Sequence, residues 1–180
     1  LTPPPGAKAE CVIINAVECE PYLTADHQLM LEKPEQILVG VSLLMRAVNV
    51  TKGYIGIENN KPDAIALMRE KAAKYPNIEI VPLKVQYPQG GEKQLIDAVI
   101  GRQVPNPPAI PIAVGAVVQN VGTAYAVYEA VIKNKPLFER VVTVTGKALA
   151  NPSNLLTRMG TPMSMLIEAA GGMPENTGKI

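Results

Sequence analysis

Residues 11–16 read Cys-Val-Ile-Ile-Asn-Ala, and this short, mainly apolar run decides the fold. A continuous apolar run lacks the alternation of a half-exposed strand, so it is typical of a strand that is buried on both faces of a parallel sheet. Polar residues follow it, because residues 17–22 read Val-Glu-Cys-Glu-Pro-Tyr. Side chains at the carboxyl ends of such strands face the usual ligand crevice, so a binding site is expected there.

Strand and helix patterns alternate along most of the chain. After the first strand, the sequence predicts strands over residues 51–57, 78–84 and 112–118, and helices over residues 34–48, 63–74, 93–100 and 123–133. Alternation of this kind is typical of α/β proteins with a mostly parallel sheet.

The pattern changes at residue 140. Residues 141–146 predict a β-branched strand, residues 151–152 (Asn-Pro) a turn, and residues 160–167 the start of a short helix. One strand, one turn and one helix are too few to close a hydrophobic core. We therefore interpret residues 140–180 as the first part of a second small domain.

The composition argues against nucleic acid as a partner and against a membrane span. The 180 residues carry 17 Lys and Arg against 16 Asp and Glu, with one Phe and no Trp. A nucleic-acid surface needs clustered basic residues with stacking aromatics, and neither pattern is present. The longest apolar runs, residues 37–45 and 109–118, are far shorter than the roughly 20 residues that cross a bilayer. We expect no nucleic acid partner and no direct membrane span.

Three polar segments follow predicted strands, at residues 15–22, 87–93 and 119–123. Because the carboxyl ends of parallel strands lie along one edge of a sheet, we expect the three segments to converge and form a pocket. The amides of Asn15, Gln119 and Asn120 suit a neutral, planar ligand that forms hydrogen bonds. The simpler alternative is that loops are polar whatever their function.

The middle segment contains Gly90 and Gly91 directly before a predicted helix. Glycine allows positive φ angles and a close approach to a ligand, and the N-terminus of a helix offers unpaired N–H groups to an anion. This geometry is typical of a cofactor loop, although a turn before a helix has the same composition when it only ends a strand.

Three carboxylates, Glu18, Glu20 and Asp26, lie in or just after the first segment. We interpret them as solvated loop charges. The alternatives are an unspecific metal site made of oxygens alone or a pair of acid and base groups, but the latter needs carboxylates on both sides of a cleft. His27 is the only histidine, and we interpret it as a residue at the start of a helix rather than a base.

Other chemical motifs are absent from the sequence. Cys11 and Cys19 are eight residues apart, a spacing that matches no zinc or iron–sulfur motif, so we interpret them as structural thiols. The sequence contains no GxGxxG, Walker A or GxSxG motif. We therefore predict no catalytic side chain and no metal ligand.

The loops closely resemble those of the C subunits of Rnf electron-transport complexes. The resemblance is carried by residues 14–26 (INAVECEPYLTAD), 87–95 (YPQGGEKQL) and 118–123 (VQNVGT), in the same order and spacing. More distantly, the chain is similar to the flavin-carrying subunit of respiratory complex I. The resemblance implies a Rossmann-like, mostly parallel sheet with helices on both faces over residues 1–139. It also implies the start of a soluble-ligand-binding β-grasp (SLBB) domain over residues 140–180.

The resemblance implies a function in electron transport. Such a subunit accepts hydride from NADH on a bound FMN and passes single electrons to [4Fe-4S] clusters of a membrane-bound, ion-translocating complex that exchanges electrons with ferredoxin. Its partners would be NADH and the other Rnf subunits, at the cytoplasmic face of the bacterial cell membrane. Two alternatives stay open: a related flavin and iron–sulfur reductase of cobalamin, and a non-catalytic scaffold that docks membrane subunits.

The resemblance also implies a set of cofactor-binding residues drawn from the three polar segments. The set consists of Asn15, Glu18, Glu20, Gly90, Gly91, Glu92, Gln119 and Asn120. The first three would lie beside the flavin ring, the next three would face the flavin and nicotinamide, and the last two would reach the ribityl phosphate.

The chain departs from the family in three respects. The family's glycine-rich phosphate loop is expected just before Leu1, and the cysteines that hold the [4Fe-4S] clusters are expected well after Ile180. Val17 stands where relatives from complex I carry an acidic residue. We therefore expect residues 1–180 by themselves to lack tight FMN binding, clusters and activity.

Overall fold

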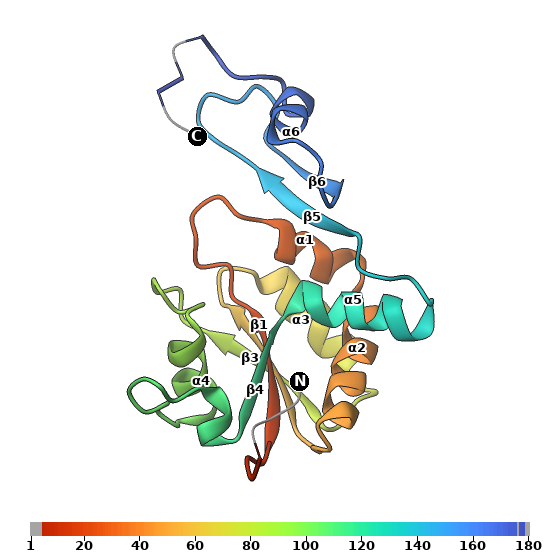
Figure 1. Cartoon of the computed structure of the whole chain (residues 1–180), viewed down its shortest axis with the longest axis vertical. Coiled ribbons are helices and arrows are strands. Elements are labelled where there is room, and N and C mark those ends of the chain that lie inside the picture. Colours follow the sequence, from red (N-terminus) through yellow and green to blue (C-terminus); the bar gives the residue numbers. More distant parts are fainter. Residues whose placement is uncertain (1–4, 176, 179–180) are drawn as a thin grey trace.

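A four-stranded parallel sheet forms the centre of the chain (Figure 1). The structure is a computed structural model that describes residues 5–175 and 177–178. The strands of the sheet are β1 (Cys11–Ala16), β2 (Gly53–Glu58), β3 (Ile78–Leu83) and β4 (Ala116–Asn120). Their order is β3-β2-β1-β4, and each neighbouring pair is parallel.

Helices connect these strands and cover both faces of the sheet. They are α1 (Ala25–Glu32), α2 (Pro34–Ala47), α3 (Pro62–Ala72), α4 (Glu92–Ile100) and α5 (Val121–Ile132), with a 3₁₀ turn, η1 (Pro111–Val114), before β4. Proline occupies the first position of α2 and α3, where its missing N–H would have had no helical partner. The expected Rossmann-like architecture is thus confirmed.

Strand β1 separates two hydrophobic cores. Val12 and Ile14 pack in one cluster with α2, α3 and α5, and Ile13 packs in a second cluster with α4. All three side chains are fully buried, as the continuous apolar run predicts. Figure 1 shows α4 on one side of the sheet and α2 on the other.

The strand order places a reversal of the winding direction between β1 and β4. From β1 the chain passes to β2 and β3 on one side, and it then returns to add β4 on the other side. In open α/β sheets the ligand crevice lies at such a reversal, beyond the carboxyl ends of the strands. The end of β1 at Ala16 and the end of β4 at Asn120 mark this place.

The C-terminal part forms a small unit beyond this edge of the main sheet (Figure 1). Strands β5 (Glu139–Val144) and β6 (Ser153–Arg158) pair as an antiparallel hairpin, and α6 (Met163–Ala169) follows. Several apolar side chains of this unit are exposed, and Leu156 and Met163 are both 67% exposed. The unit therefore leaves part of its apolar surface uncovered.

The structure corrects the predicted strand at residues 112–118. Pro111 begins the 3₁₀ turn, and Gly115, with a φ of +77°, ends it, so that β4 begins at Ala116. The predicted loop at residues 119–123 is also wrong, because β4 continues to Asn120 and α5 begins at Val121 without a linker. Strand β6 had no predicted counterpart, and only the start of helix α1, at His27, was predicted. Strand β6 forms by pairing with β5, and the apolar pattern of residues 153–158 does not predict a strand.

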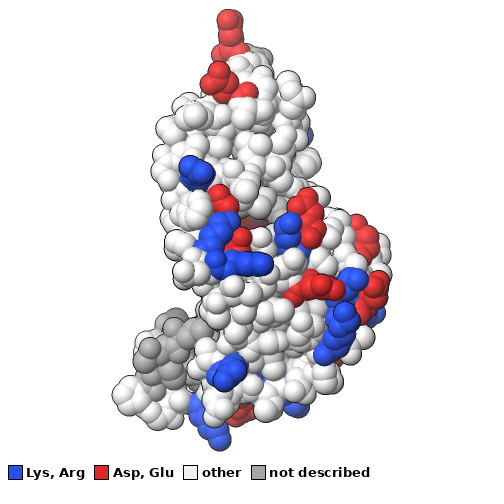
Figure 2. All heavy atoms as spheres, turned by 90° about the vertical axis from the view of Figure 1, so that its right-hand side faces the viewer, with Lys and Arg blue, Asp and Glu red and all other residues white. Residues whose placement is uncertain are grey.

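The surface carries a balanced charge. On the face in Figure 2, basic and acidic side chains lie interspersed over the α/β part, and the C-terminal unit is largely uncharged. A basic patch of the kind that binds nucleic acid is not seen on this face.

Within residues 5–175 and 177–178, no helix combines the length and the hydropathy that a membrane span requires.

Gly40 provides a test of the packing of α2 against α5. A Cβ atom at Gly40 would lie 1.9 Å from the carbonyl oxygen of Ala124, so that Gly40→Ala would force the two helices apart. We expect the free energy of unfolding to fall by about 3 kcal/mol in urea denaturation, as for a severely overpacked core. The control is Gly146→Ala, because a Cβ there meets only ordinary contacts with Leu149 at 3.9 Å or more. Equal stability of the two variants would contradict the close packing.

Candidate functional site

Asn15 lies at the end of β1 and connects the three polar segments. Its side-chain Nδ2 donates a hydrogen bond to the carbonyl oxygen of Gly90 at 2.9 Å, and its Oδ1 accepts one from the backbone N–H of Val17 at 3.1 Å. Its backbone oxygen accepts a longer hydrogen bond, 3.5 Å, from Nδ2 of Asn120. The expectation that the segments converge at one edge of the sheet is therefore confirmed.

A groove of about 560 Å³ borders two of the joined segments, and neither Asn15 nor Asn120 lines it. Its walls come from the segment after β1, from the glycine loop before α4 and from strand β5. The lining includes Glu18, Cys19, Glu20, Gly90, Gly91 and Thr143. The volume is within the range of small-molecule sites, roughly 300 to 1,000 Å³.

Gly90 allows the two loops of the groove to touch. A Cβ atom at Gly90 would lie 2.6 Å from the carbonyl oxygen of Val17 and 3.0 Å from Sγ of Cys19. The neighbouring Gly91 precedes α4 and has an extended backbone, with φ of −62° and ψ of 132°. The glycines therefore give this wall of the groove a surface of bare backbone.

The carboxylate of Glu18 closes the N-terminus of α1. Its two oxygens accept hydrogen bonds from the backbone N–H groups of Asp26 at 2.8 Å and His27 at 3.1 Å. One oxygen also pairs with Nζ of Lys61 at 2.8 Å. The side chains of Glu18 and Lys61 are 6% and 9% exposed, so this is a buried ion pair. A helix N-terminus and an ammonium group together stabilise the negative charge.

Lys61 also lies near a second buried carboxylate. Glu58, at the end of β2, is 2% exposed, and its backbone oxygen accepts a hydrogen bond from the Lys61 N–H at 3.1 Å. Burial raises the pKa of Glu58, and the positive charge of Lys61 acts in the opposite direction. The lysine thus partly offsets the cost of burying acidic groups at this edge of the sheet.

Asn120 is the N-cap of α5, and both the oxygen and the nitrogen of its side-chain amide have hydrogen-bond partners. Its Oδ1 accepts hydrogen bonds from the N–H of Gly122 at 2.9 Å and from a guanidinium nitrogen of Arg140 at 2.7 Å. Its Nδ2 donates to Oδ2 of Asp26 at 2.7 Å. Burial raises the pKa of Asp26, mainly through loss of hydration, while the bond from Asn120 opposes the shift.

Three further predicted site residues, Glu20, Glu92 and Gln119, differ in whether they line the groove. Glu20 is exposed and lines the groove. Glu92 is exposed as the first residue of α4 and does not line the groove, and neither does Gln119, which lies on β4. The roles of all eight residues in cofactor binding stay predictions.

The interpretation of the acidic residues as solvated loop charges is wrong for two of them. Glu18 is buried against Lys61, and Asp26 bonds to Asn120, whereas Glu20 is exposed as expected. His27 is confirmed as a residue of the first helical turn, and its ring Nε2 lies 2.9 Å from Asp63. The roles of Lys61 and Arg140 could not be predicted, because nothing in their local sequence indicates partners 43 and 20 residues away.

The described residues contain no group of three or more His, Cys, Asp or Glu side chains arranged to hold a metal ion. Cys11 is buried and Cys19 is partly buried, and both are free thiols. Burial raises the pKa of Cys11, which keeps its thiol protonated and unreactive.

Comparison with protein families divides the sequence into two matched parts. The sequence profile of the Nuo51 FMN-binding domain matches residues 1–129, and that of the SLBB domain matches residues 141–179. The first match covers more than half of the 180 residues.

Individual relatives agree with the family matches. The chain is 44% identical over its whole length to the C subunit of the Na(+)-translocating ferredoxin:NAD(+) oxidoreductase complex of Acetobacterium woodii. It is 46% identical to the C subunit of the proton-translocating ferredoxin:NAD(+) oxidoreductase complex of Clostridium ljungdahlii. The chain spans only 40% and 39% of these relatives, respectively. The resemblance carried by the three loops is thereby confirmed.

A solved structure shares the fold. The crystal structure of an NAD+-reducing [NiFe]-hydrogenase in the H2-reduced state matches 90% of this chain with a TM-score of 0.75 and 25% sequence identity. The match covers 33% of the hydrogenase chain.

Lys61→Met tests the buried ion pair. The substitution keeps much of the side-chain volume but leaves Glu18 without its cation, so we expect the free energy of unfolding to fall by about 3 kcal/mol in urea denaturation. Adding Glu18→Gln removes the orphaned charge and should recover part of the loss. The control is Lys71→Met, which removes an exposed pair with Glu70 and should leave the midpoint unchanged. Full stability of the single variant would show that the pair contributes nothing.

Asp26→Asn tests the raised pKa of Asp26. Because the folded state disfavours the charged carboxylate, ionisation of Asp26 destabilises the protein once the pH exceeds the ordinary carboxyl pKa of 3.8. The amide removes this cost and can still accept the hydrogen bond from Asn120. We expect the variant to be more stable than wild type at pH 7, with the difference shrinking as the pH falls toward 4. Denaturation curves between pH 4 and 8 measure the difference, and a gap that widens in acid would contradict the assignment.

Proposed function

The chain belongs to the family of the Nuo51 FMN-binding domain, and from this we propose that it is the FMN- and NADH-binding part of a C subunit of an ion-translocating ferredoxin:NAD(+) oxidoreductase complex. In this proposal the full-length subunit takes electrons from NADH through FMN and passes them to [4Fe-4S] clusters. The observation that carries the proposal is the meeting of three distant polar segments at Asn15, beside a groove large enough for a ligand.

We further propose the division of the chain into two domains. Residues 1–139 form the α/β domain that binds FMN and NADH, and residues 140–180 form part of an SLBB domain. The matched ranges and the separate β5–β6 sheet support a boundary close to residue 140.

The groove fits a flat aromatic cofactor. Gly90 and Gly91 line it with backbone rather than side chains, which suits close stacking of a flavin and a nicotinamide. Glu20 lies on the same groove and is exposed to solvent, so that it can contact a ligand directly. FMN, when bound, supplies the conversion between two-electron and one-electron transfer.

The two asparagines position the segments around the groove, although neither lines it. Asn15 holds the glycine loop in place, and the orientation of the Asn120 amide is set by its own partners. In our proposal Gln119 and Asn120 serve the ribityl phosphate end, and Asn15, Glu18 and Glu20 lie at the ring end. Gly90, Gly91 and Glu92 face the flavin and the nicotinamide.

The electrostatics of the helix ends favour this orientation. Glu18 already occupies the N-terminus of α1, so that an added phosphate there would meet a carboxylate. At the N-terminus of α5, the guanidinium of Arg140 adds a positive charge to the helix dipole. An anionic phosphate is therefore expected near α5. Glu18 contributes by ordering its own segment.

The names of the relatives support a role within a larger assembly. Both are subunits of oxidoreductase complexes, and we propose that this chain also works within a membrane-bound complex, peripherally at the cytoplasmic face of the bacterial cell membrane. The [4Fe-4S] clusters would be held outside residues 1–180, and these residues alone would lack activity. The same names favour this function over that of a cobalamin reductase.

The test is the reaction of the full-length subunit with NADH. We expect the purified protein to carry a yellow flavin whose absorbance is bleached by stoichiometric NADH without oxygen and returns when an electron acceptor is added. The flavin released on denaturation should be FMN. A colourless protein that ignores both FMN and NADH would overturn the proposal and favour a docking scaffold.

A further inference from the structure

Strand β5 of the C-terminal unit contributes to the N-terminus of α1. The hydroxyl Oγ1 of Thr143 accepts hydrogen bonds from the backbone N–H groups of Thr24 at 3.3 Å and Ala25 at 3.1 Å. The side chain of Thr24 makes no capping bond of its own. A helix leaves its first N–H groups without helical partners, and Thr143 satisfies groups that Glu18 does not reach.

The hairpin orients this hydroxyl. Thr143 lies opposite Asn154 in the β5–β6 pairing, and its Oγ1 donates a hydrogen bond to Oδ1 of Asn154 at 2.7 Å. Because the single hydroxyl proton is used there, the lone pairs of Oγ1 remain free to accept from α1. Nδ2 of Asn154 in turn donates to Oγ1 of Thr24 at 3.0 Å. The cap of α1 is therefore built across two parts of the chain.

The same strand reaches the N-terminus of α5 through Arg140. Its guanidinium bonds to Oδ1 of Asn120, the N-cap of α5, at 2.7 Å. A Cβ atom at Gly122 would lie 3.0 Å from this guanidinium, so the missing side chain makes room for Arg140. A guanidinium can only donate, and Asp26 can accept at the other end of the amide, so these contacts define which way Asn120 points.

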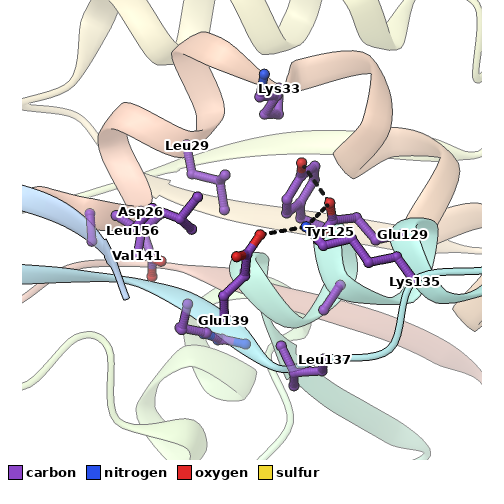
Figure 3. Close-up of a pocket in the computed structure, with 14 residues that line it drawn as sticks. Asp26, Leu29, Lys33, Tyr125, Glu129, Lys135, Leu137, Glu139, Val141 and Leu156 are labelled. Atoms are coloured by element: carbon purple, nitrogen blue, oxygen red, sulfur yellow. Dashed lines mark hydrogen bonds and ion pairs between the residues drawn. The ribbon is translucent and has the colours of Figure 1, made fainter. Parts of the chain in front are cut away.

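A pocket behind these contacts shows how β5 is held at its start (Figure 3). Lys135 pairs with Glu129 of α5 at 2.9 Å and with Glu139 of β5 at 2.6 Å. The hydroxyl of Tyr125 donates to the same glutamate of α5 at 3.2 Å. The enclosed space is about 230 Å³, and Figure 3 shows Lys135 reaching toward both carboxylates. The strand is thus anchored at Glu139, next to Arg140.

We propose that β5 supplies two positioning residues to the cofactor groove. Arg140 fixes the Asn120 amide at the N-terminus of α5, and Thr143 fixes the N-terminus of α1. The inference rests on the proposed function, because the groove that they order is the proposed FMN site. Its consequence is that the C-terminal unit determines how tightly the α/β domain holds FMN.

The first arm of the test follows hydrogen exchange in the full-length protein without added cofactor. In Thr143→Val, the amides of Thr24 and Ala25 lose their acceptor and should exchange about tenfold faster. The amides of Asp26 and His27, which bond to Glu18, should keep their protection. Thr143→Ser retains the hydroxyl and should restore slow exchange. Unchanged exchange at Thr24 and Ala25 in Thr143→Val would overturn the role of Thr143.

The second arm measures FMN affinity by quenching of FMN fluorescence in a titration of the full-length protein. Arg140→Gln should weaken FMN binding by about tenfold, the loss of one charge-assisted hydrogen bond. Arg140→Lys keeps a charged donor for Asn120, whereas Gln offers only a neutral one, so the Lys variant should bind FMN more tightly than the Gln variant. The control is Arg158→Gln on β6, whose guanidinium lies over the ring of Phe138, and it should bind FMN like wild type.

The outcomes separate this inference from the proposed function. Wild-type affinity in Arg140→Gln would overturn the role of Arg140 but leave the proposed function standing. A wild-type protein that binds no FMN would overturn both that role and the proposed function, while the exchange arm would still decide the role of Thr143. If Arg140→Gln does not fold, Gly122→Ala crowds the bond between Arg140 and Asn120 without removing a charge, because the new Cβ would lie 3.0 Å from the guanidinium and 3.1 Å from Oδ1 of Asn120. That variant should also weaken FMN binding, and unchanged binding would contradict the inference.

Discussion

The hydrogen bonds of the Asn15 side chain hold the functional edge of this protein together. The side chain stands at the carboxyl end of the central strand, and its amide joins the segment that follows β1 to the glycine loop before α4. The backbone oxygen of Asn15 accepts a hydrogen bond from the side chain of Asn120, at the end of the neighbouring strand β4. The Asn15 side chain thus reaches a segment 75 residues away, and the Asn15 backbone oxygen bonds to a side chain 105 residues away.

The buried negative charge of Glu18 is compensated by the backbone N–H groups of α1 and by the ammonium group of Lys61. The carboxylate of Glu18 accepts hydrogen bonds from the first turn of α1 and pairs with Lys61. Lys61 lies shortly after the end of β2 at Glu58. A buried pair of this kind adds little net stability, because desolvation offsets most of the attraction. Its effect here is geometric, since it ties α1 and the segment after β1 to the neighbouring strand. The groove therefore has one wall that is ordered before any ligand arrives.

The second wall belongs to a different part of the chain. Arg140 and Thr143 reach the ends of α5 and α1 from a hairpin that pairs with no strand of the main sheet. Hydrogen bonds to backbone and amide groups and the ion pairs of Lys135 thus join the α/β part to the C-terminal unit. Such contacts are directional, so a shift of the hairpin changes the ends of both helices. This makes the hairpin part of the site and not an appended module.

The sequence by itself determined the fold class, the parallel sheet and the convergence of three polar segments. A continuous apolar strand and the alternation of strands and helices follow from local composition, which decides how each segment buries its surface. The resemblance of the loops added the family. Only the tertiary structure decided that β6 forms, that β4 begins at Ala116, that Glu18 is buried against Lys61 and that Arg140 holds Asn120. These features depend on partners that are distant along the chain, and a polar side chain looks the same in the sequence whether it meets water or a buried charge.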